Sequence, residues 1–436
     1  MTKKLKTFPK GVHPKDQKNA TRDKALVEAP RAELIVLPLQ QSAGVPAEPL
    51  VKVRDTVLTG QKIAETGALI SASLHTPVSG TVKAIELRPH HTGLKLMSIV
   101  IQPDEEQQCV ELTPGPDDPD PEYIRNAVRE AGIVGLGGAA FPTRVKISPP
   151  PEMKVDTVII NGCECEPYLT VDHRQMVENA GAIVDGLKLL VKAVGAKRGI
   201  VGVEDNKPEA VEAVRKATAG TDFEVVVLET KYPQGAEKQL IHAALGREVP
   251  SGALPGHVGV LVQNVGTAAA ISAAVREGRP LIRRAVTVGG SGIHEPKNLV
   301  VDIGTSIKDL VEYCGGLTDG AAKVIIGGPM MGATVASLDV PVVKATSGVI
   351  ALSRDELTEM DYQPCIKCGR CVEACPMGLM PNRLSVMSEI LIWDEMKDEH
   401  VFDCVECGSC SFVCPSKRPL VQQIRLGKYE LKKDKT

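Results

Sequence analysis

Between residues 34 and 101 the hydrophobic positions come in short runs, and Gly, Pro and Ser separate each run from the next. Short runs rich in Val, Ile and Leu and bounded by turn residues are typical of β-strands. The runs lie at residues 34–37, 49–53, 61–64, 80–87 and 95–101. This pattern predicts a small all-β module near the N-terminus.

A second pattern begins after a Pro- and Asp-rich linker at residues 113–121. Strand-like runs at 157–160, 199–203, 223–228 and 258–262 alternate with helical periodicity at about 122–131, 174–195, 208–219, 234–246 and 267–278. Strands that alternate with helices of this length favour a largely parallel sheet with helices on both faces. The middle of the chain is therefore predicted to be an α/β domain.

The remainder of the chain shows two further patterns. Residues 284–352 return to short strands with one helical segment at 306–314, which indicates a small α+β module. Residues 377–400 carry apolar side chains at helical spacing, including Leu384 and Met387, and predict one or two helices. The chain after Leu420 is polar and basic. Together these patterns predict a multidomain α/β protein.

The composition narrows the functional classes. With 436 residues the chain is long enough for about three domains. A net charge of −3 and 3% aromatic residues provide neither the basic surface nor the stacking side chains that nucleic-acid binding needs. The N-terminus lacks the apolar core of a signal peptide, and no run of 18 apolar residues occurs. We expect neither a signal peptide nor a transmembrane segment.

Eight of the 12 cysteines lie in two copies of the pattern C-x₂-C-x₂-C-x₃-C-P. This spacing is typical of a two-cluster bacterial ferredoxin, in which the fourth Cys of each run binds the other cluster. The predicted ligands of one 4Fe-4S cluster are Cys365, Cys368, Cys371 and Cys414, and those of the other are Cys404, Cys407, Cys410 and Cys375.

Two other uses of these cysteines were weighed. Zinc sites usually pair two C-x₂-C units across a longer spacer, which differs from three Cys within seven residues followed by a fourth. Disulfides require an oxidising compartment. The spacing therefore favours iron–sulfur clusters, and reduced thiolates point to a reducing, cytoplasmic compartment.

A glycine-rich turn follows the helical pattern at 122–131 and reads Gly135-Leu-Gly-Gly-Ala-Ala-Phe-Pro-Thr-Arg-Val-Lys146. Glycines allow backbone N–H groups to approach an anionic ligand closely. Thr143 and Lys146 can supply a hydroxyl group and a positive charge to a phosphate. Glycines also end helices routinely, so the turn alone is equally consistent with a structural role.

A second turn, Asn161-Gly-Cys-Glu-Cys-Glu-Pro167, follows the first strand of the predicted parallel sheet. Ligands of such sheets gather where strands end, so Glu164 and Glu166 are candidates to bind ribose hydroxyls. A solvated loop is the alternative. Cys163 and Cys165 lack an obvious third ligand nearby and are expected to be small thiols.

These motifs resemble a known family. The segment Gly135–Lys146 resembles the Gly-x-Gly-Gly-Ala-Gly-Phe-Pro-Thr-x-x-Lys flavin loop of the NADH-oxidising flavoprotein subunit of respiratory complex I. The turn Asn161–Pro167 is similar to that family's Asn-Ala-Asp-Glu-Ser-Glu-Pro, and Gln263–Thr267 resembles its Asn-Asn-Val-Glu-Thr. This chain departs from the family at Ala140, which replaces a Gly, and at Cys163, which replaces the Asp.

The resemblance implies a bound, non-covalent FMN that exchanges a hydride with NADH or NAD⁺. Such a flavin converts paired electrons into the single electrons that clusters carry, and no side chain is needed as a catalytic acid or base. The residues that the resemblance assigns to FMN and NAD(H) are Gly135, Gly137, Gly138, Ala139, Phe141, Thr143, Lys146, Asn161, Glu164, Glu166 and Asn264.

The N-terminal β module has its own resemblance. The segments at 51–57, 60–65 and 77–85 resemble the barrel-sandwich hybrid of lipoyl and biotinyl carriers. Those carriers bear their cofactor on a Lys in the hairpin between the second and third segments. The corresponding hairpin, residues 68–75, contains no Lys, so a rigid docking module is expected.

The order of the modules resembles the RnfC family of Rnf electron-transport complexes, as do the motifs Gly11–Pro14 and Gly327–Gly332 and the resemblance of residues 284–352 to a β-grasp ligand-binding module. The expected organisation is an extension (1–30), a barrel-sandwich hybrid (31–112), a Rossmann-like FMN/NADH domain (120–280), a β-grasp module (281–352), a helical two-cluster ferredoxin-like domain (353–420) and a polar tail (421–436).

The family resemblance implies a peripheral subunit on the cytoplasmic face of a membrane complex that couples ferredoxin/NAD redox chemistry to Na⁺ or H⁺ translocation. Its implied partners are the other subunits, NAD(H), and ferredoxin, either directly or through another subunit. Two alternatives stay open at this point: an NADH-dependent cobalamin-reducing flavoprotein, and a wiring subunit without NADH activity.

Overall fold

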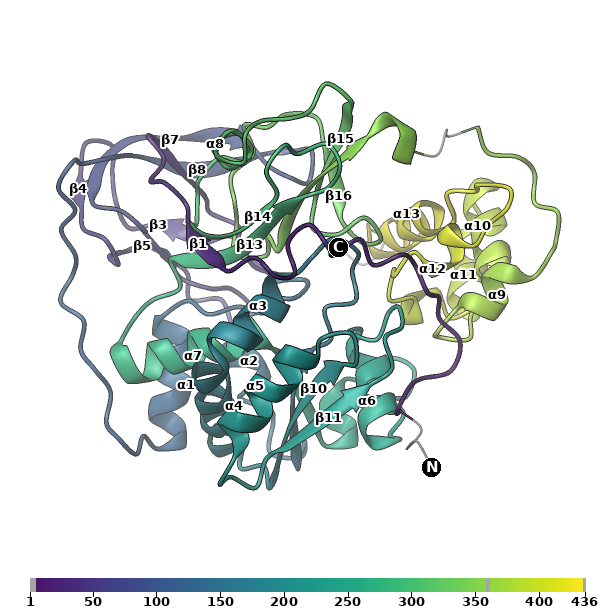
Figure 1. The fold of residues 1–436 in the computed structure, drawn as a ribbon, viewed down its shortest axis with the longest axis horizontal. Helices are drawn as coiled ribbons and strands as arrows, with labels where there is room; N and C mark the ends of the chain where they lie inside the picture. Colours follow the sequence, from purple (N-terminus) through teal and green to yellow (C-terminus); the bar gives the residue numbers. More distant parts are fainter. Residues whose placement is uncertain (1–4, 358–360, 434–436) are drawn as a thin grey trace.

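The computed structural model describes residues 5–357 and 361–433, which form four modules bound together by an N-terminal strap, residues 5–28. In Figure 1 the helix-covered α/β domain lies below, two β-rich modules lie above it, and the cysteine module lies at the right. Within the described residues, no helix combines the length and apolarity needed to cross a bilayer. The multidomain α/β architecture expected from the sequence is present.

The barrel module consists of two small antiparallel sheets. One sheet contains β2 (Ile35–Pro38), β8 (Lys95–Pro103), β7 (Gly80–Pro89) and β4 (Thr56–Val57) in that order, and the other contains β3 (Glu48–Pro49), β5 (Lys62–Glu65) and β6 (Leu74–His75). Alternating side chains such as Ile35, Ile63 and Ile99 meet between the sheets and are fully buried. The prediction of a small all-β module is confirmed.

The α/β domain contains a four-stranded parallel sheet in the order β11-β10-β9-β12. Its strands are β9 (Thr157–Gly162), β10 (Arg198–Glu204), β11 (Glu224–Leu228) and β12 (Val260–Asn264), and its helices are α1 (Pro121–Glu130), α2 (Thr143–Lys146), α3 (Val171–Glu178), α4 (Ala180–Val194), α5 (Pro208–Thr218), α6 (Glu237–Leu245), α7 (Val265–Glu277) and the 3₁₀ turn η1 (Pro255–Val258). The single helix expected over 174–195 is wrong: Asn179 leaves the helical region at φ −125° and separates α3 from α4.

Both faces of this sheet are covered, because successive side chains of each strand point to opposite sides. Val158 and Ile160 pack on one face in the core that includes α4 and α7. Ile159 packs on the other face, in a separate core with Leu240 of α6. The sheet is therefore buried from both sides, as the continuous apolar runs predict.

The β-grasp module is a mixed sheet to which the strap contributes a strand. In sheet order its strands are β1 (Leu26–Glu28), β14 (Lys297–Asp302), β13 (Arg283–Gly289), β17 (Gly348–Ser353), β15 (Ala321–Ile326) and β16 (Ala333–Val335), accompanied by α8 (Ile307–Tyr313) and the 3₁₀ turn η2 (Arg354–Glu356). Strand β1 of the strap pairs in parallel with β14 at the edge of this sheet.

The cysteine module is a small helical bundle. It contains α9 (Arg370–Ala374), α10 (Pro381–Glu389), α11 (Trp393–Asp398), the 3₁₀ turn η3 (Val401–Asp403), α12 (Ser409–Phe412) and α13 (Leu420–Lys433). The polar tail expected from residue 421 is instead helix α13, up to the last described residue. Leu420, Ile424 and Leu431 lie at helical spacing and are buried, with Ile424 and Leu431 in the core of the bundle.

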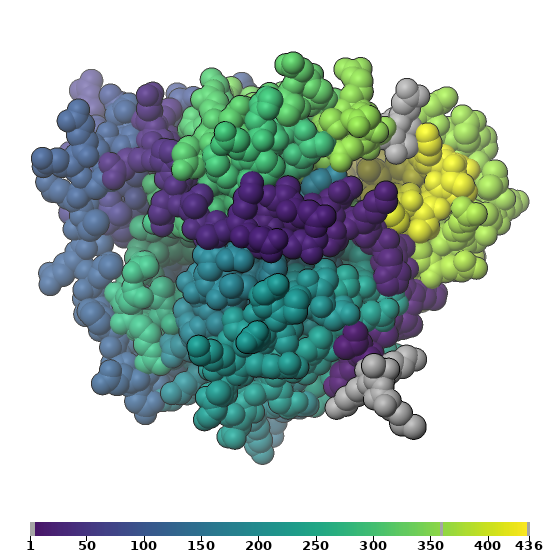
Figure 2. All heavy atoms as spheres, viewed as in Figure 1, coloured from purple at the N-terminus to yellow at the C-terminus, as the bar shows by residue number. Residues whose placement is uncertain are grey.

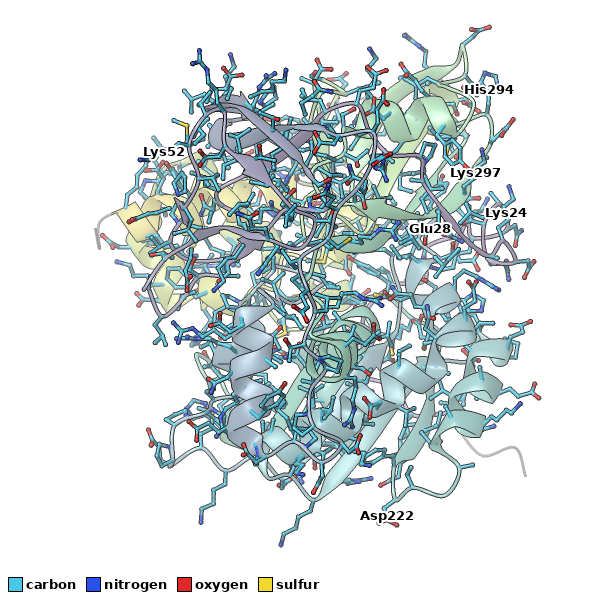
Figure 3. All side chains as sticks on the ribbon, turned by 90° about the vertical axis from the view of Figure 1, so that its left-hand side faces the viewer. Lys24, Glu28, Lys52, Asp222, His294 and Lys297 are labelled. Carbon is cyan, nitrogen blue, oxygen red and sulfur yellow. The ribbon has the colours of Figure 1, made fainter. Side chains whose placement is uncertain are left out.

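The strap crosses the face of the molecule and contacts three modules (Figure 2). Val12 pairs with Tyr232 of the α/β domain through two backbone hydrogen bonds of 2.8 and 2.9 Å. The backbone N–H of Gly11 donates to the carbonyl of Ala374 in the cysteine module. Lys24 donates to the backbone of the β-grasp module, and Figure 3 shows Lys24 beside Lys297 on that side. The strap therefore fixes the relative positions of these modules.

Lys344 joins three modules from the interior. Its Nζ donates to the carbonyl of Ser73 in the barrel module at 2.7 Å and to that of Gly132 beside α1 at 2.6 Å. Its side chain is buried and has no salt bridge within the described residues. Burial without a neighbouring carboxylate favours the neutral amine and lowers the pKa of Lys344 from 10.5 to about 7.

Lys344→Met is expected to change the pH dependence of stability. Between about pH 7 and 10.5 the unfolded chain holds the proton that folded Lys344 has released. The free energy of unfolding of the native protein therefore rises with pH across this window, by up to about 1.4 kcal/mol per pH unit, relative to the variant. Denaturant titrations followed by circular dichroism at several pH values measure this difference.

The matched control is Lys188→Met, which removes an exposed lysine of α4. Its difference from the native protein should not depend on pH between 7 and 10. An equal pH dependence for both variants would contradict the role assigned to Lys344.

Candidate redox site

Two cavities of about 350 Å³ lie in the cysteine module, and each is lined by four cysteines. The outer cavity is lined by Cys365, Cys368, Cys371 and Cys414, and the inner cavity by Cys375, Cys404, Cys407 and Cys410. Each cavity thus combines three cysteines of one run with the fourth of the other run. This grouping is the one expected from the spacing of the two runs.

The donor set fits an iron–sulfur cube. Within the described residues, no three His, Cys, Asp or Glu side chains converge closely enough to hold a single metal ion. Each set of four free thiols instead surrounds a volume, which suits a multi-iron cluster and not a tetrahedral zinc ion. The chemistry and arrangement of the ligands therefore agree.

The two cysteine runs repeat the same backbone conformation. Lys367 and Glu406 occupy equivalent positions with φ of 55° and 57°, and Gly369 and Gly408 follow with φ of 80° and 78°. The left-handed residues direct the N–H of Lys367 to the sulfur of Cys365 at 3.4 Å, and that of Glu406 to Cys404 at the same distance. A hydrogen bond to sulfur stabilises the thiolate form that binds iron.

The two cavities differ in exposure. Cys375, Cys407 and Cys410 of the inner cavity are at most 8% exposed. In the outer cavity Cys368 is exposed and Cys365 is half-buried. The inner cavity therefore faces the rest of the molecule and the outer cavity faces solvent.

The glycine-rich turn is closed into a hairpin and anchored to α7. The N–H of Gly135 donates to the carbonyl of Phe141 at 2.9 Å, and the N–H of Leu136 donates to the hydroxyl of Thr267 at 2.9 Å. A Cβ at Gly137 would lie 2.8 Å from Nδ2 of Asn264, whereas a Cβ at Gly138 would meet nothing within 4 Å. Gly137 is thus required by packing, and Gly138 borders open space.

Ala140 marks the departure from the flavin-loop pattern. Its φ of 49° lies in the left-handed region, which costs an L-residue roughly 1–2 kcal/mol and glycine almost nothing. The glycine that the pattern has at this position is therefore explained by the backbone. The turn of this chain keeps that conformation despite the substitution.

Beyond the turn, Thr143 and Lys146 begin and end α2. Thr143 is fully buried, and its hydroxyl has no hydrogen-bond partner among the described residues. Nζ of Lys146 lies 2.8 Å from a carboxylate oxygen of Glu237 and 2.8 Å from the carbonyl of Val262. Thr143 therefore offers an unused polar group, while Lys146 brings its charge to the end of β12.

Asn161 and Asn264 lie side by side where β9 and β12 end, because the two residues are partners in the parallel register. Nδ2 of Asn161 donates to the carbonyl of Gly235 at 2.8 Å. Nδ2 of Asn264 donates to Asp172 at 2.6 Å. This edge is where ligands of doubly wound sheets bind, and it places both amides next to the glycine-rich turn.

Glu164 is not part of a solvated loop. It is buried, and its carboxylate accepts from the N–H groups of Asp172 at 2.8 Å and His173 at 3.3 Å, which caps the start of α3. Burial beside Glu164 raises the pKa of Asp172 to about 7. These carboxylates therefore form a buried acidic group behind Asn264.

Glu166 reaches the β-grasp module. Its carboxylate accepts from the N–H groups of Met330 at 3.0 Å and Met331 at 2.9 Å. Burial raises the pKa of Glu166 to about 7 despite these hydrogen bonds. The carbonyl of Met330 in turn would lie 2.8 Å from a Cβ at Gly408, so this loop is held between Glu166 and the inner cysteine run.

The segment Tyr232–Glu237 belongs to the site and was not identified from the sequence. The hydroxyl of Tyr232 donates to the carbonyl of Cys407 at 2.6 Å, while Gly235 and Glu237 accept from Asn161 and Lys146. Gln234 is fully buried, and neither polar atom of its amide has a partner among the described residues. The signal was its position directly after β11, whose end lies at the same edge as β9 and β12.

Four parts of the chain match known domain families in the order of the observed modules. Residues 6–106 match the RnfC barrel sandwich hybrid domain and residues 128–273 match the Nuo51 FMN-binding domain. Residues 285–334 match the SLBB domain and residues 364–418 match the 4Fe-4S dicluster domain. The fold and its two cysteine cavities thus define a flavin- and iron–sulfur-dependent electron-transfer protein.

Close relatives cover almost the whole chain. It is 47% identical over 430 residues to the RnfC-type protein of the proton-translocating ferredoxin:NAD(+) oxidoreductase complex of Clostridium ljungdahlii, with 98% of this chain and 94% of that protein covered. It is 45% identical over 436 residues to the corresponding protein of the Na(+)-translocating ferredoxin:NAD(+) oxidoreductase complex of Acetobacterium woodii, with 99% and 98% covered. The chain belongs to the RnfC family of the Rnf ion-translocating oxidoreductase complexes.

A solved structure shares the fold at greater distance. The NAD+-reducing [NiFe]-hydrogenase in its air-oxidized state has a chain that is 18% identical, with a TM-score of 0.50. The match covers 72% of this chain and 61% of the hydrogenase chain.

Tyr232→Phe is expected to lower the stability of the protein by about 1–2 kcal/mol, because it leaves the buried carbonyl of Cys407 without its donor. The measurement is the denaturant midpoint of the iron-loaded protein, followed by the loss of cluster absorbance. Tyr168→Phe is the control, since the Tyr168 hydroxyl donates to Glu356 at the surface and its removal should cost far less. Equal effects of the two substitutions would refute a special role for Tyr232.

Proposed function

We propose that this chain exchanges a hydride between NAD(H) and a bound FMN and passes the electrons singly through two 4Fe-4S clusters. The observation that carries the proposal is the segment Tyr232–Glu237. Its first residue bonds the inner cysteine run, and Gly235 and Glu237 bond the two residues expected at the flavin, Asn161 and Lys146. Six residues span at most about 20 Å, so the flavin site and the inner cavity are close.

The proposed FMN-contacting residues lie around one edge of the parallel sheet. Gly138 borders open space, Thr143 has an unused buried hydroxyl, and Lys146 brings a positive charge, as a ligand with a phosphate requires. Bound FMN would supply the conversion between two-electron and one-electron transfer. Gly137 and Asp172 position the amide of Asn264, and Glu164 fixes the start of α3 beside it.

The two cavities are proposed to hold one cluster each, with the ligands expected from the sequence. The inner cluster lies next to the α/β domain through Tyr232, and the outer cluster is exposed through Cys368. We therefore infer the order NAD(H), FMN, inner cluster, outer cluster for electrons that leave the chain, and the reverse order for electrons that enter it.

The relatives are named as parts of complexes that translocate protons or Na⁺ and link ferredoxin to NAD⁺. We infer that this chain serves as a peripheral subunit of such a membrane complex, at its cytoplasmic face. Ferredoxin is proposed to deliver electrons either directly or through another subunit. The reduced thiolates needed for the clusters support the cytoplasmic location.

Protein purified without oxygen should contain one FMN and about eight irons per chain, and it should reduce ferricyanide with NADH. Cofactor analysis and a steady-state assay measure this. Clusters without flavin would support the wiring role instead, and NADH-dependent reduction of cobalamin at a comparable rate would support the cobalamin-reducing enzyme.

Lys146→Ala should weaken the retention of FMN by roughly 10- to 100-fold, as expected for the loss of one charge-assisted hydrogen bond. Equilibrium dialysis with measurement of flavin fluorescence gives the dissociation constant. Lys188→Ala, on the exposed side of α4, is the control and should leave the constant unchanged. An unaltered constant for Lys146→Ala would remove this residue from the site.

A further inference from the structure

The outer cavity opens onto a surface whose chemistry suggests a partner. Three large apolar side chains next to its cysteines are strongly exposed: Ile366 at 67%, Phe412 at 53% and Tyr362 at 49%. Ile366 lines the cavity and directly follows Cys365. Exposed apolar side chains grouped in this way are typical of an interaction site.

Cations surround the same opening. Lys367, Arg370 and Lys417 lie within three residues of the cavity cysteines and are exposed. Nζ of Lys10 in the strap lies 3.2 Å from the carbonyl of Val372, on the same helix as Cys371. None of these four cations forms a salt bridge with a described residue.

Other cations of the cysteine module are paired, which makes this group distinctive. Arg383 pairs with Glu399, Arg418 with Glu389, and Arg425 and Lys428 with Glu406. Two carboxylates, Asp361 and Glu373, also lie near the opening. Four cations and two carboxylates leave a local charge of about +2 on a chain whose net charge is −3.

We propose that this rim, made of Tyr362, Ile366, Phe412, Lys10, Lys367, Arg370 and Lys417, is the docking surface for a small acidic iron–sulfur carrier protein. An apolar centre bordered by charge is the anatomy of transient protein interfaces. Unpaired cations accelerate the encounter with a partner of opposite charge. The inference rests on the proposed function, because it requires a cluster in the outer cavity.

The transfer itself is balanced by one electron. The reduced carrier loses one electron and the outer cluster gains it, or the reverse, and no covalent bond forms or breaks. The inner cavity is unsuited to this exchange, because three of its cysteines are buried and its run packs against Tyr232 and Met330. The outer rim is thus the better exposed of the two cluster surfaces.

The test uses the complete protein with its flavin and clusters, and an acidic two-cluster ferredoxin reduced with dithionite as the probe. Stopped-flow absorbance gives the second-order rate constant of electron transfer. The double variant Lys367→Glu/Lys417→Glu should lower this constant at least tenfold at low ionic strength. The difference should largely disappear at about 0.5 M salt, where screening acts within a few ångströms.

Lys188→Glu/Lys216→Glu is the control, because it makes the same change in net charge on exposed lysines of the α/β domain. It should stay within twofold of the native protein. A similar loss in both double variants, or no loss in the rim variant, would overturn the proposal. If charge reversal lowers the iron content, the milder Lys367→Gln/Lys417→Gln decides, with an expected loss of about threefold.

Reduction of the clusters by NADH, measured without ferredoxin, separates this inference from the proposed function. Native protein and rim variants should show the same rate, since the rim lies outside the path from flavin to outer cluster. Failure of NADH to reduce clusters in the native protein would refute the proposed function. Normal reduction together with an unaltered ferredoxin rate in the rim variant would refute only the docking surface.

Discussion

The hydrogen bond from the Tyr232 hydroxyl to the carbonyl of Cys407 sets the relation between the two halves of the site. Tyr232 is almost completely buried, and burial together with nearby Glu166 raises the pKa of its hydroxyl, which therefore remains a donor. Its backbone is fixed by Val12 of the strap. Because the side chain cannot change position without leaving a buried carbonyl unpaired, the inner cysteine run is held against the end of β11.

The β-grasp module supports this junction and contributes no ligand of its own to either cavity. Its loop at Gly327–Gly332 is gripped by Glu166 on one side and lies against Gly408 on the other. The barrel module lies on the opposite side of the α/β domain, where Lys344 links it to the interior. Its hairpin has no Lys that could carry a cofactor, so its place in the fold is one of support.

Much of this architecture could be predicted from the sequence, because the signals were local. The grouping of cysteines follows from spacing within each run, and the parallel sheet follows from alternating periodicities. The remainder depends on contacts between distant residues. Tyr232 and Cys407 are 175 positions apart, and Lys146 and Glu237 are 91 apart, so neither pair leaves a local pattern. Helix α13 was missed because its apolar positions are few and widely spaced among charged residues.

The strap carries a consequence for biosynthesis. Lys10 bonds a residue 362 positions later, and Gly11 bonds Ala374, so the first segment to leave the ribosome binds a surface translated near the end. Until the cysteine runs have emerged, this segment has only part of its binding surface. Contacts over such separations form late and slowly. Closure of the strap is thus a natural final step of maturation, after which both ends of the polypeptide secure the same redox junction.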